Sequence, residues 1–168
     1  LPDGFRTQLT GFTASEAETL FFAGLPGPAA ELGLADLMAM RAVGVERDDA
    51  SGREAIRLYE RLALDPQVED EVYGLLANLK MHAGDVPGAV AAAQKFAERR
   101  PGDADAAQLL ARSLVQDGKP EEALDTWETA ARLAQAREQW EILAEIVRDL
   151  AKRGQTPRAT ELARQIGH

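Results

Sequence analysis

The chain has 168 residues, of which 45% are hydrophobic, and it contains no cysteine. This length is enough for one domain with its own core, and the lack of cysteine excludes disulfide frameworks, cysteine zinc sites and thiol nucleophiles. The net charge of −9 would repel a phosphate backbone, so we expect no direct contact with nucleic acid.

The residue pattern favours an all-α protein. Aromatic residues make up only 5% of the chain, and no segment alternates apolar and polar residues as a half-buried strand would. We expect roughly 70% helix and no strand. No apolar run is long enough to cross a membrane and no signal peptide is visible, so the expected location is cytoplasmic. Because the chain begins with Leu1, we expect part of the protein to precede it.

The N-terminal stretch DGFRTQLTGFTASEAETLFFAGLPGPAAELGLADL, Asp3 to Leu37, predicts two short helices. Thr13 and Glu16 form a capping box for the first, and a second helix begins near Ala29 after the GLPGP break. The first helix carries more apolar surface than a lone hairpin can cover, which predicts packing in a homodimer or, alternatively, onto the rest of the chain. The apolar residues concerned are Leu20, Phe21, Phe22 and Leu25.

The same stretch resembles the segment that follows the DNA-binding helix-turn-helix in bacterial WYL-type transcriptional regulators. The resemblance rests on the Thr-x-x-Glu helix start and the run LPGPAAELGL, and it fades after Leu37. It implies a sensor or dimerisation portion of a regulator whose DNA-binding domain lies outside this chain. A helical pair that caps the rest of the fold is the alternative. We assign residues 1–45 to this N-terminal segment.

The next element is a helix within SGREAIRLYERLALDP, Ser51 to Pro66. Ser51 and Glu54 are predicted to form its capping box, and Ala55, Tyr59 and Leu62 to be its packing residues. The acidic cluster of residues 69–71 is then expected to cap the helix that follows it.

From residue 70 onward the chain repeats around Gly84, Gly118 and Gly154. A large residue recurs eight positions before each glycine and a smaller one seven before it. Alanine recurs five positions after the glycine, and two further packing residues stand nine and twelve after it. This spacing predicts antiparallel helical hairpins, each with a glycine turn and with Pro120 or Pro157 near the start of the second helix. The predicted packing residues are Leu76, Ala77, Ala89, Ala93, Phe96, Leu110, Ala111, Ala123, Trp127, Ala130, Ile146, Val147, Ala159, Ala163 and Ile166.

The first two glycines are 34 residues apart, and a 34-residue helix–turn–helix unit resembles the tetratricopeptide repeat (TPR). The resemblance covers residues 50–168, with about three units and a partial one, and two residues are inserted before the third glycine turn. It implies a right-handed superhelix of hairpins over residues 46–168. The protein would then be a non-enzymatic scaffold that binds other proteins, as part of a bacterial regulatory protein.

No constellation for catalysis, metal or cofactor binding is visible. A phosphate loop would need Lys and Ser or Thr after its last glycine, whereas Gly88 is followed by Ala89 and Val90. The chain has only two histidines, His82 and His168, too few for a multi-histidine metal site. We therefore expect neither an enzyme nor a cofactor.

Two columns of polar and basic residues remain, and they identify the candidate binding site. In stacked hairpins the first helix of each unit lines the concave side, where a partner's segment can bind. The positions six and two residues before the turn glycines fall on that side, and we expect them to form a site for a protein or peptide, with an acidic one favoured. They are occupied by Asn78, His82, Arg112, Gln116, Arg148 and Lys152. A groove that is merely solvated is the alternative.

Overall fold

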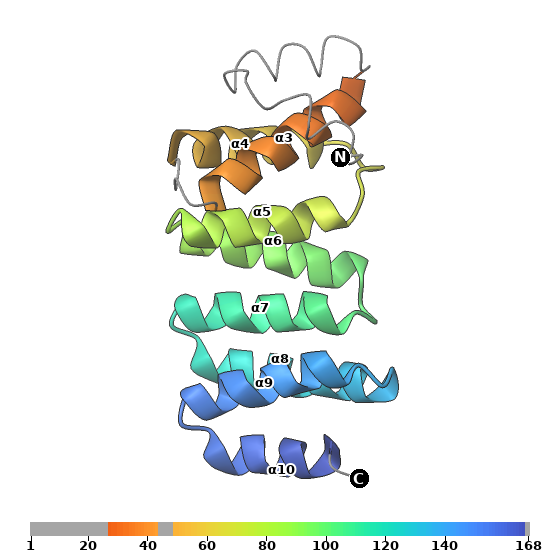
Figure 1. Ribbon diagram of the computed structural model, residues 1–168, viewed down its shortest axis with the longest axis vertical. Helices are drawn as coiled ribbons and strands as arrows, with labels where there is room; N and C mark the ends of the chain where they lie inside the picture. The colour runs from red at the N-terminus through yellow and green to blue at the C-terminus, as the bar shows by residue number, and fades with distance from the viewer. Residues whose placement is uncertain (1–26, 44–48, 167–168) are drawn as a thin grey trace, which may run out of the picture. The chain divides into compact units, whose positions relative to one another are not determined.

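A computed structural model describes residues 27–43 and 49–166 of the chain. Every element in these ranges is an α-helix, which confirms the all-α expectation for the described residues (Figure 1). The helices are α3 (Gly27–Val43), α4 (Asp49–Leu62), α5 (Glu71–His82), α6 (Val86–Arg99), α7 (Ala104–Gln116), α8 (Pro120–Ala136), α9 (Trp140–Lys152) and α10 (Thr156–Ile166).

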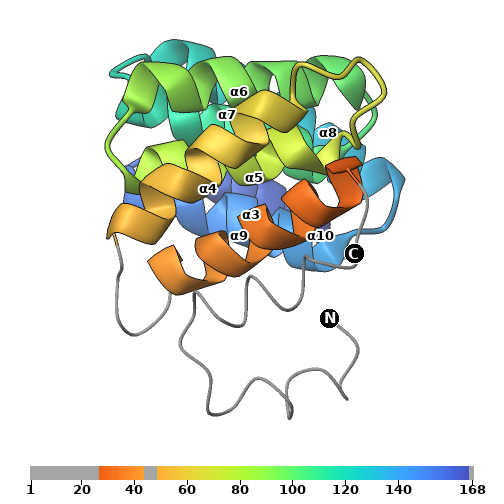
Figure 2. The same cartoon turned by 90° about the horizontal axis from the view of Figure 1, so that it is seen from above.

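Contacts divide the chain into two units between Pro66 and Gln67. In the first unit α3 and α4 lie side by side and run in opposite directions (Figures 1 and 2). Tyr59 of α4 is fully buried and its hydroxyl donates a 2.5 Å hydrogen bond to Oδ1 of Asp36 on α3. Ala55 and Leu62 are also buried, so the three packing residues predicted for this helix are confirmed.

The predicted capping box at Ser51 is wrong. The helix begins at Asp49, which places Ser51 inside its first turn, where its side chain is buried. Asp49 supplies the acidic side chain near the helix start, which favours the earlier beginning. The boundary predicted at residues 45 and 46 and the apolar residues Leu20, Phe21, Phe22 and Leu25 lie outside the described residues.

The second unit consists of three hairpins, α5–α6, α7–α8 and α9–α10. The three turns within the hairpins share one geometry, with φ of +80°, +75° and +77° at Gly84, Gly118 and Gly154. In each, the residue after the glycine donates its N–H to a carbonyl five residues earlier, as Asp85 does to Lys80 at 2.9 Å. This is the Schellman helix ending, in which only glycine adopts the left-handed conformation without strain. The predicted turns are thus confirmed.

Small and large residues alternate in the core of the first two hairpins. Ala93 and Ala130 are fully buried, while Phe96 and Trp127 are 8% and 1% exposed, so each hairpin pairs one bulky side chain with one alanine as predicted. The alanines allow close approach of the helices and the aromatic rings fill the remaining space.

The third hairpin is packed less completely. Ile146 is buried, but Val147 is only half-buried and Ala163 is exposed, in contrast to the buried residues at the equivalent positions of the earlier hairpins. α9 also packs less extensively on α8 than α7 does on α6. The inserted residues lengthen α8 to 17 residues against 14 in α6, and the connection to α9 includes Glu138 with φ of 55°.

The acidic residues place negative charge at the start of α5 as predicted, with Asp70 at the N-cap position and Glu71 in the first turn. Asp70 occupies the N-cap position without a side-chain cap hydrogen bond. Its carboxylate instead accepts a 2.5 Å hydrogen bond from Nε of Arg99 on α6, and Glu71 pairs at 2.5 Å with Arg100. The two arginines lie at the end of α6, close to the start of the antiparallel α5, and a guanidinium binds a carboxylate more strongly than a backbone N–H does.

Candidate partner-binding face

The first helices of the three hairpins, α5, α7 and α9, run in the same direction and successive members contact one another (Figure 1). We call the exposed residues of these helices the first-helix face. Because the helices are parallel, residues at equivalent positions form columns that cross from one helix to the next.

All six residues predicted for the binding site are exposed on this face. The central column contains Asn78, Arg112 and Arg148, and the end column contains His82, Gln116 and Lys152. Asn78 uses one amide hydrogen locally, because Nδ2 donates to the Gly74 carbonyl at 3.1 Å, and its amide oxygen has no partner among the described residues.

The cations of these columns are loosely held. Nε of Arg112 lies 4.0 Å from Oδ2 of Asp149 on α9, and Nη2 of Arg148 lies 3.9 Å from Oε1 of Glu145. Both guanidinium side chains are more than half exposed, at 52% and 67%. Lys152 has no hydrogen bond or ion pair with any residue that the structure describes. An exposed contact of this length is worth little in water, so these charges remain available to a ligand.

Most other cations of the second unit interact closely with neighbouring side chains. They form ion pairs between 2.5 and 3.4 Å or, in Arg153, stack over the Trp127 ring at 5.2 Å from its centroid. The residues in ion pairs are Lys80, Lys95, Arg99, Arg100, Lys119, Arg158 and Arg164. Arg132 and Arg137 at the end of α8 also form no ion pair with the described residues, and with them the cations of the first-helix face are the weakly paired ones of this unit.

A third column, which the sequence analysis missed, is acidic. Glu71 is the first residue of α5, Asp105 and Glu141 are the second residues of α7 and α9, and all three are exposed. Burial raises the pKa of Asp105, and the neighbouring carboxylates of Asp103 and Glu145 raise it further. The signal was present in the sequence, because an acidic residue stands thirteen positions before every turn glycine.

Between the acidic and central columns the exposed residues are Leu75 on α5, at 40%, and Glu145 on α9, and Ala144 is half-buried. Gly74 and Leu109 are buried at this level. Gln108 is buried here and its Nε2 donates to Oε2 of Glu145 at 3.4 Å, which links α7 to α9.

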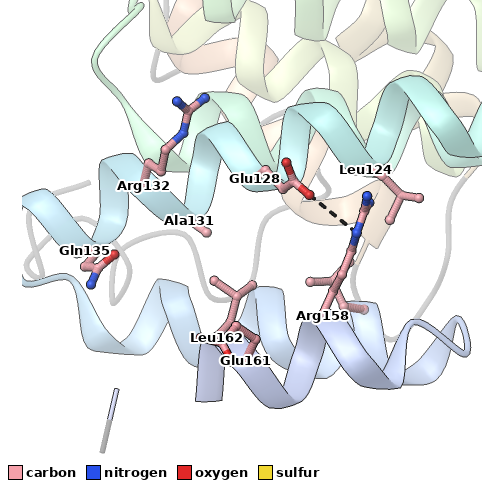
Figure 3. Close-up of a pocket in the computed structure, with 9 residues that line it drawn as sticks. Leu124, Glu128, Ala131, Arg132, Gln135, Arg158, Glu161 and Leu162 are labelled. Atoms are coloured by element: carbon pink, nitrogen blue, oxygen red, sulfur yellow. Dashed lines mark ion pairs between the residues drawn. The ribbon is translucent and has the colours of Figure 1, made fainter. Parts of the chain in front are cut away.

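A separate cavity of about 420 Å³ lies between the second helices α8 and α10 (Figure 3). Its apolar lining is formed by Leu124, Ala131, Leu150 and Leu162. Figure 3 shows Glu128 and Arg158 reaching toward each other from the two helices, and their ion pair measures 3.4 Å. Glu161 is paired with Arg164 at 2.8 Å. With its charges largely paired internally, this cavity offers little to select a charged ligand.

The glycine-rich stretch after His82 is structural. Gly84 forms the turn, and the backbone N–H of Gly88 donates to Oδ1 of Asp85 at 3.0 Å, which caps α6. A Cβ on Gly88 would lie 2.1 Å from this carboxylate, so a larger residue would displace the cap. Within the described ranges no cluster of His, Asp and Glu could hold a metal ion, and no helix is long and apolar enough to cross a membrane.

No protein-family model matches the chain, and no curated protein matches it. Among solved structures, the crystal structure of MamA has a TM-score of 0.70 and 17% sequence identity, and covers 98% of this chain and 91% of that chain. A second structure, MamA MSR-1 C2, has a TM-score of 0.62 and 18% identity with the same coverage. At this identity the likeness shows the fold alone. The chain thus has a TPR-like helical-repeat fold, in which every element of the described residues is an α-helix.

Proposed function

We propose that the protein is a non-enzymatic interaction module that binds an acidic segment of a partner protein on its first-helix face. Arg112, Arg148 and Lys152 hold the carboxylates, while Asn78, Gln116 and His82 donate hydrogen bonds to the partner's backbone. The observation that carries the proposal is the weak ion pairing of the two arginines, at 4.0 and 3.9 Å, on a face where three parallel helices align them. The remaining contact of Arg148 is a 3.4 Å hydrogen bond from Nε to the Ala144 carbonyl.

Two features of the arginines support a role in binding. Both lie six residues before their turn glycine, in the middle of the helix, so favourable interaction with the helix dipole at the last turn does not account for them. Lys152 and His82 do lie in the last turn and also have that local role. A guanidinium can bind a carboxylate through two parallel hydrogen bonds, which suits acidic side chains or a chain-terminal carboxylate.

The test is a binding titration with fluorescent peptides rich in glutamate and leucine. Replacing Arg112 and Arg148 together by alanine removes two charge-assisted contacts of about 1.5 kcal/mol each, which corresponds to a roughly hundredfold weaker affinity. The helical spectrum and the melting temperature should be nearly unchanged because both side chains are exposed. Binding should also weaken as salt rises.

Arg132→Ala with Arg164→Ala is the matched control, since it removes the same charge from exposed positions on α8 and α10. This variant should bind as the parent does. If Arg112→Ala with Arg148→Ala binds the acidic peptides with unchanged affinity, the proposal is wrong.

The alternative is the sensor or dimerisation portion of a WYL-related regulator. It is supported only by the resemblance of Asp3 to Leu37, most of which lies outside the described residues. Its test is the coding sequence upstream of Leu1, which on this reading encodes a winged helix.

A further inference from the structure

The first-helix face carries opposite charges on two parallel columns. Glutamate or aspartate stands at the acidic column and arginine at the central column on both α7 and α9. The pairs are Asp105 with Arg112 and Glu141 with Arg148, seven residues apart in each helix. Seven residues make almost two full turns, so the members of each pair share one side of the helix.

The separation of the columns matches the size of a helix. Seven residues at about 1.5 Å per residue place the columns roughly 10 Å apart, and an α-helix with its side chains is about 10–12 Å wide. Between the columns lie Leu75 of α5, which is 40% exposed, and the half-buried Ala144 of α9, against which an apolar stripe could pack. Leu109 of α7 is buried and Glu145 of α9 is exposed.

We propose that the segment bound on this face is an amphipathic α-helix with a basic flank and an acidic flank, lying across α5, α7 and α9. Its basic flank faces Asp105 and Glu141, and its acidic flank faces Arg112 and Arg148. This inference rests on the proposed function and specifies the chemistry of the partner.

The acidic column is available for such a contact on α7 and α9. Glu141 has no hydrogen bond or ion pair with the residues that the structure describes. Partial burial raises the pKa of Asp105, and the carboxylates of Asp103 and Glu145 raise it further, while Arg100 only partly offsets their repulsion. A lysine or arginine from a partner would relieve that repulsion. On α5 the equivalent Glu71 is already paired with Arg100, so the contact is centred on α7 and α9.

The length of the partner helix follows from the packing. Neighbouring helices are about 8–10 Å apart, so crossing from α5 to α9 covers roughly 18 Å, or about 12 residues of helix. In a partner helix of this length, residues spaced three and four apart share one side of the helix. One such set can form the apolar stripe, and the charged residues beside it can form the two flanks.

A display library tests the inference without a known partner. Alanine-based helices of about 20 residues are displayed with both flanks randomised among Glu, Lys and Gln and the stripe among Ala, Leu and Ile. Helices selected on the full chain should carry Glu on one flank and Lys on the other. Replacing the Lys flank of a selected peptide by Gln should weaken binding roughly tenfold, and a central proline should weaken it at least as much.

Protein variants assign the two flanks. With Asp105→Asn and Glu141→Gln, the preference for the Lys flank should disappear while the need for the Glu flank remains. Glu121→Gln with Asp125→Asn, exposed on α8, is the matched control and should leave both preferences intact.

The outcomes separate the inference from the proposed function. The helix inference is wrong if the selected peptides carry acidic residues on both flanks or still bind with the central proline. The proposed function nevertheless holds in that case if Arg112→Ala with Arg148→Ala abolishes their binding. Failure to select any peptide whose binding requires these arginines overturns both.

Discussion

Tyr59 and Asp36 form a polar contact inside the first unit, between α4 and α3, and this contact leads to a testable prediction. The tyrosine is fully buried, whereas the Asp36 side chain that accepts its hydrogen bond is exposed. Tyr59→Phe keeps the ring and its packing and removes only the hydroxyl. The change therefore isolates the hydrogen bond.

The expected loss of stability is modest. A hydrogen bond to a charged acceptor contributes about 1.5–3 kcal/mol. Because water can replace the hydroxyl at the exposed Asp36 carboxylate, we expect a value at the lower end, about 1.5 kcal/mol, for the unit formed by α3 and α4. Urea unfolding followed by circular dichroism measures it.

The same contact makes the fold sensitive to alkali. Burial raises the pKa of Tyr59, and the hydrogen bond to Asp36 with its negative charge raises it further. A raised pKa means that the neutral form is favoured in the folded state, so this stabilisation is complete below the unfolded pKa of about 10 and is lost as the pH rises above it. The wild-type protein should lose stability above about pH 10 more steeply than Tyr59→Phe does.

The measurement is an alkaline titration of tyrosinate absorbance in parallel with helical ellipticity. The chain has two tyrosines, and the difference between the wild type and Tyr59→Phe reports Tyr59 alone. We expect that difference to appear only as the helices of the first unit unfold. Ionisation of Tyr59 at about pH 10 with the ellipticity intact would refute the reasoning.

Three further changes test the second unit. Arg99→Ala removes the 2.5 Å pair with Asp70, a 3.1 Å hydrogen bond to the Val68 carbonyl and a stacking contact over the Tyr73 ring. It should lower the free energy of unfolding in urea by about 1–2 kcal/mol. The control, Lys95→Ala at an exposed position, should lower it by less than about 0.5 kcal/mol. Gly118→Ala should cost about 1 kcal/mol through backbone strain alone, since a Cβ there meets nothing within 4 Å; an unchanged urea midpoint would contradict this. Asp105→Asn should stabilise the fold at neutral pH and lose that advantage in acid, because the raised pKa penalises the charged form; equal stability of both proteins at neutral pH would count against it.

The sequence predicted the repeat because its signals are local. Gly84, Gly118 and Gly154 end helices in a conformation that glycine adopts without strain, and alanine at a fixed offset allows two helices to approach closely. Such features depend on spacing along the chain, and spacing can be read directly. The exposure of the predicted binding residues follows from the same periodicity.

The remaining features depend on which side chains meet across helices, and spacing does not determine that. The sequence predicts the negative charge at the start of α5 but not the pairs of Asp70 with Arg99 and Glu71 with Arg100, which join residues 29 positions apart. The cavity crossed by Glu128 and Arg158 likewise depends on how α10 is rotated against α8. The acidic column is different, because the regular spacing of its residues can be read from the sequence. Only its position beside the arginine column had to come from the structure.

The looser packing of α9 on α8 has a mechanical consequence. In a stack where each hairpin touches only its neighbours, tension passes through the interfaces in series, and the least extensive one separates first. Within the second unit that interface lies between the hairpins α7–α8 and α9–α10. The Arg153 guanidinium over the Trp127 ring bridges it, so a pull that detaches α9 and α10 as one piece would uncover the indole. The fluorescence of Trp127 should therefore report the separation of the hairpin α9–α10 from the hairpin α7–α8.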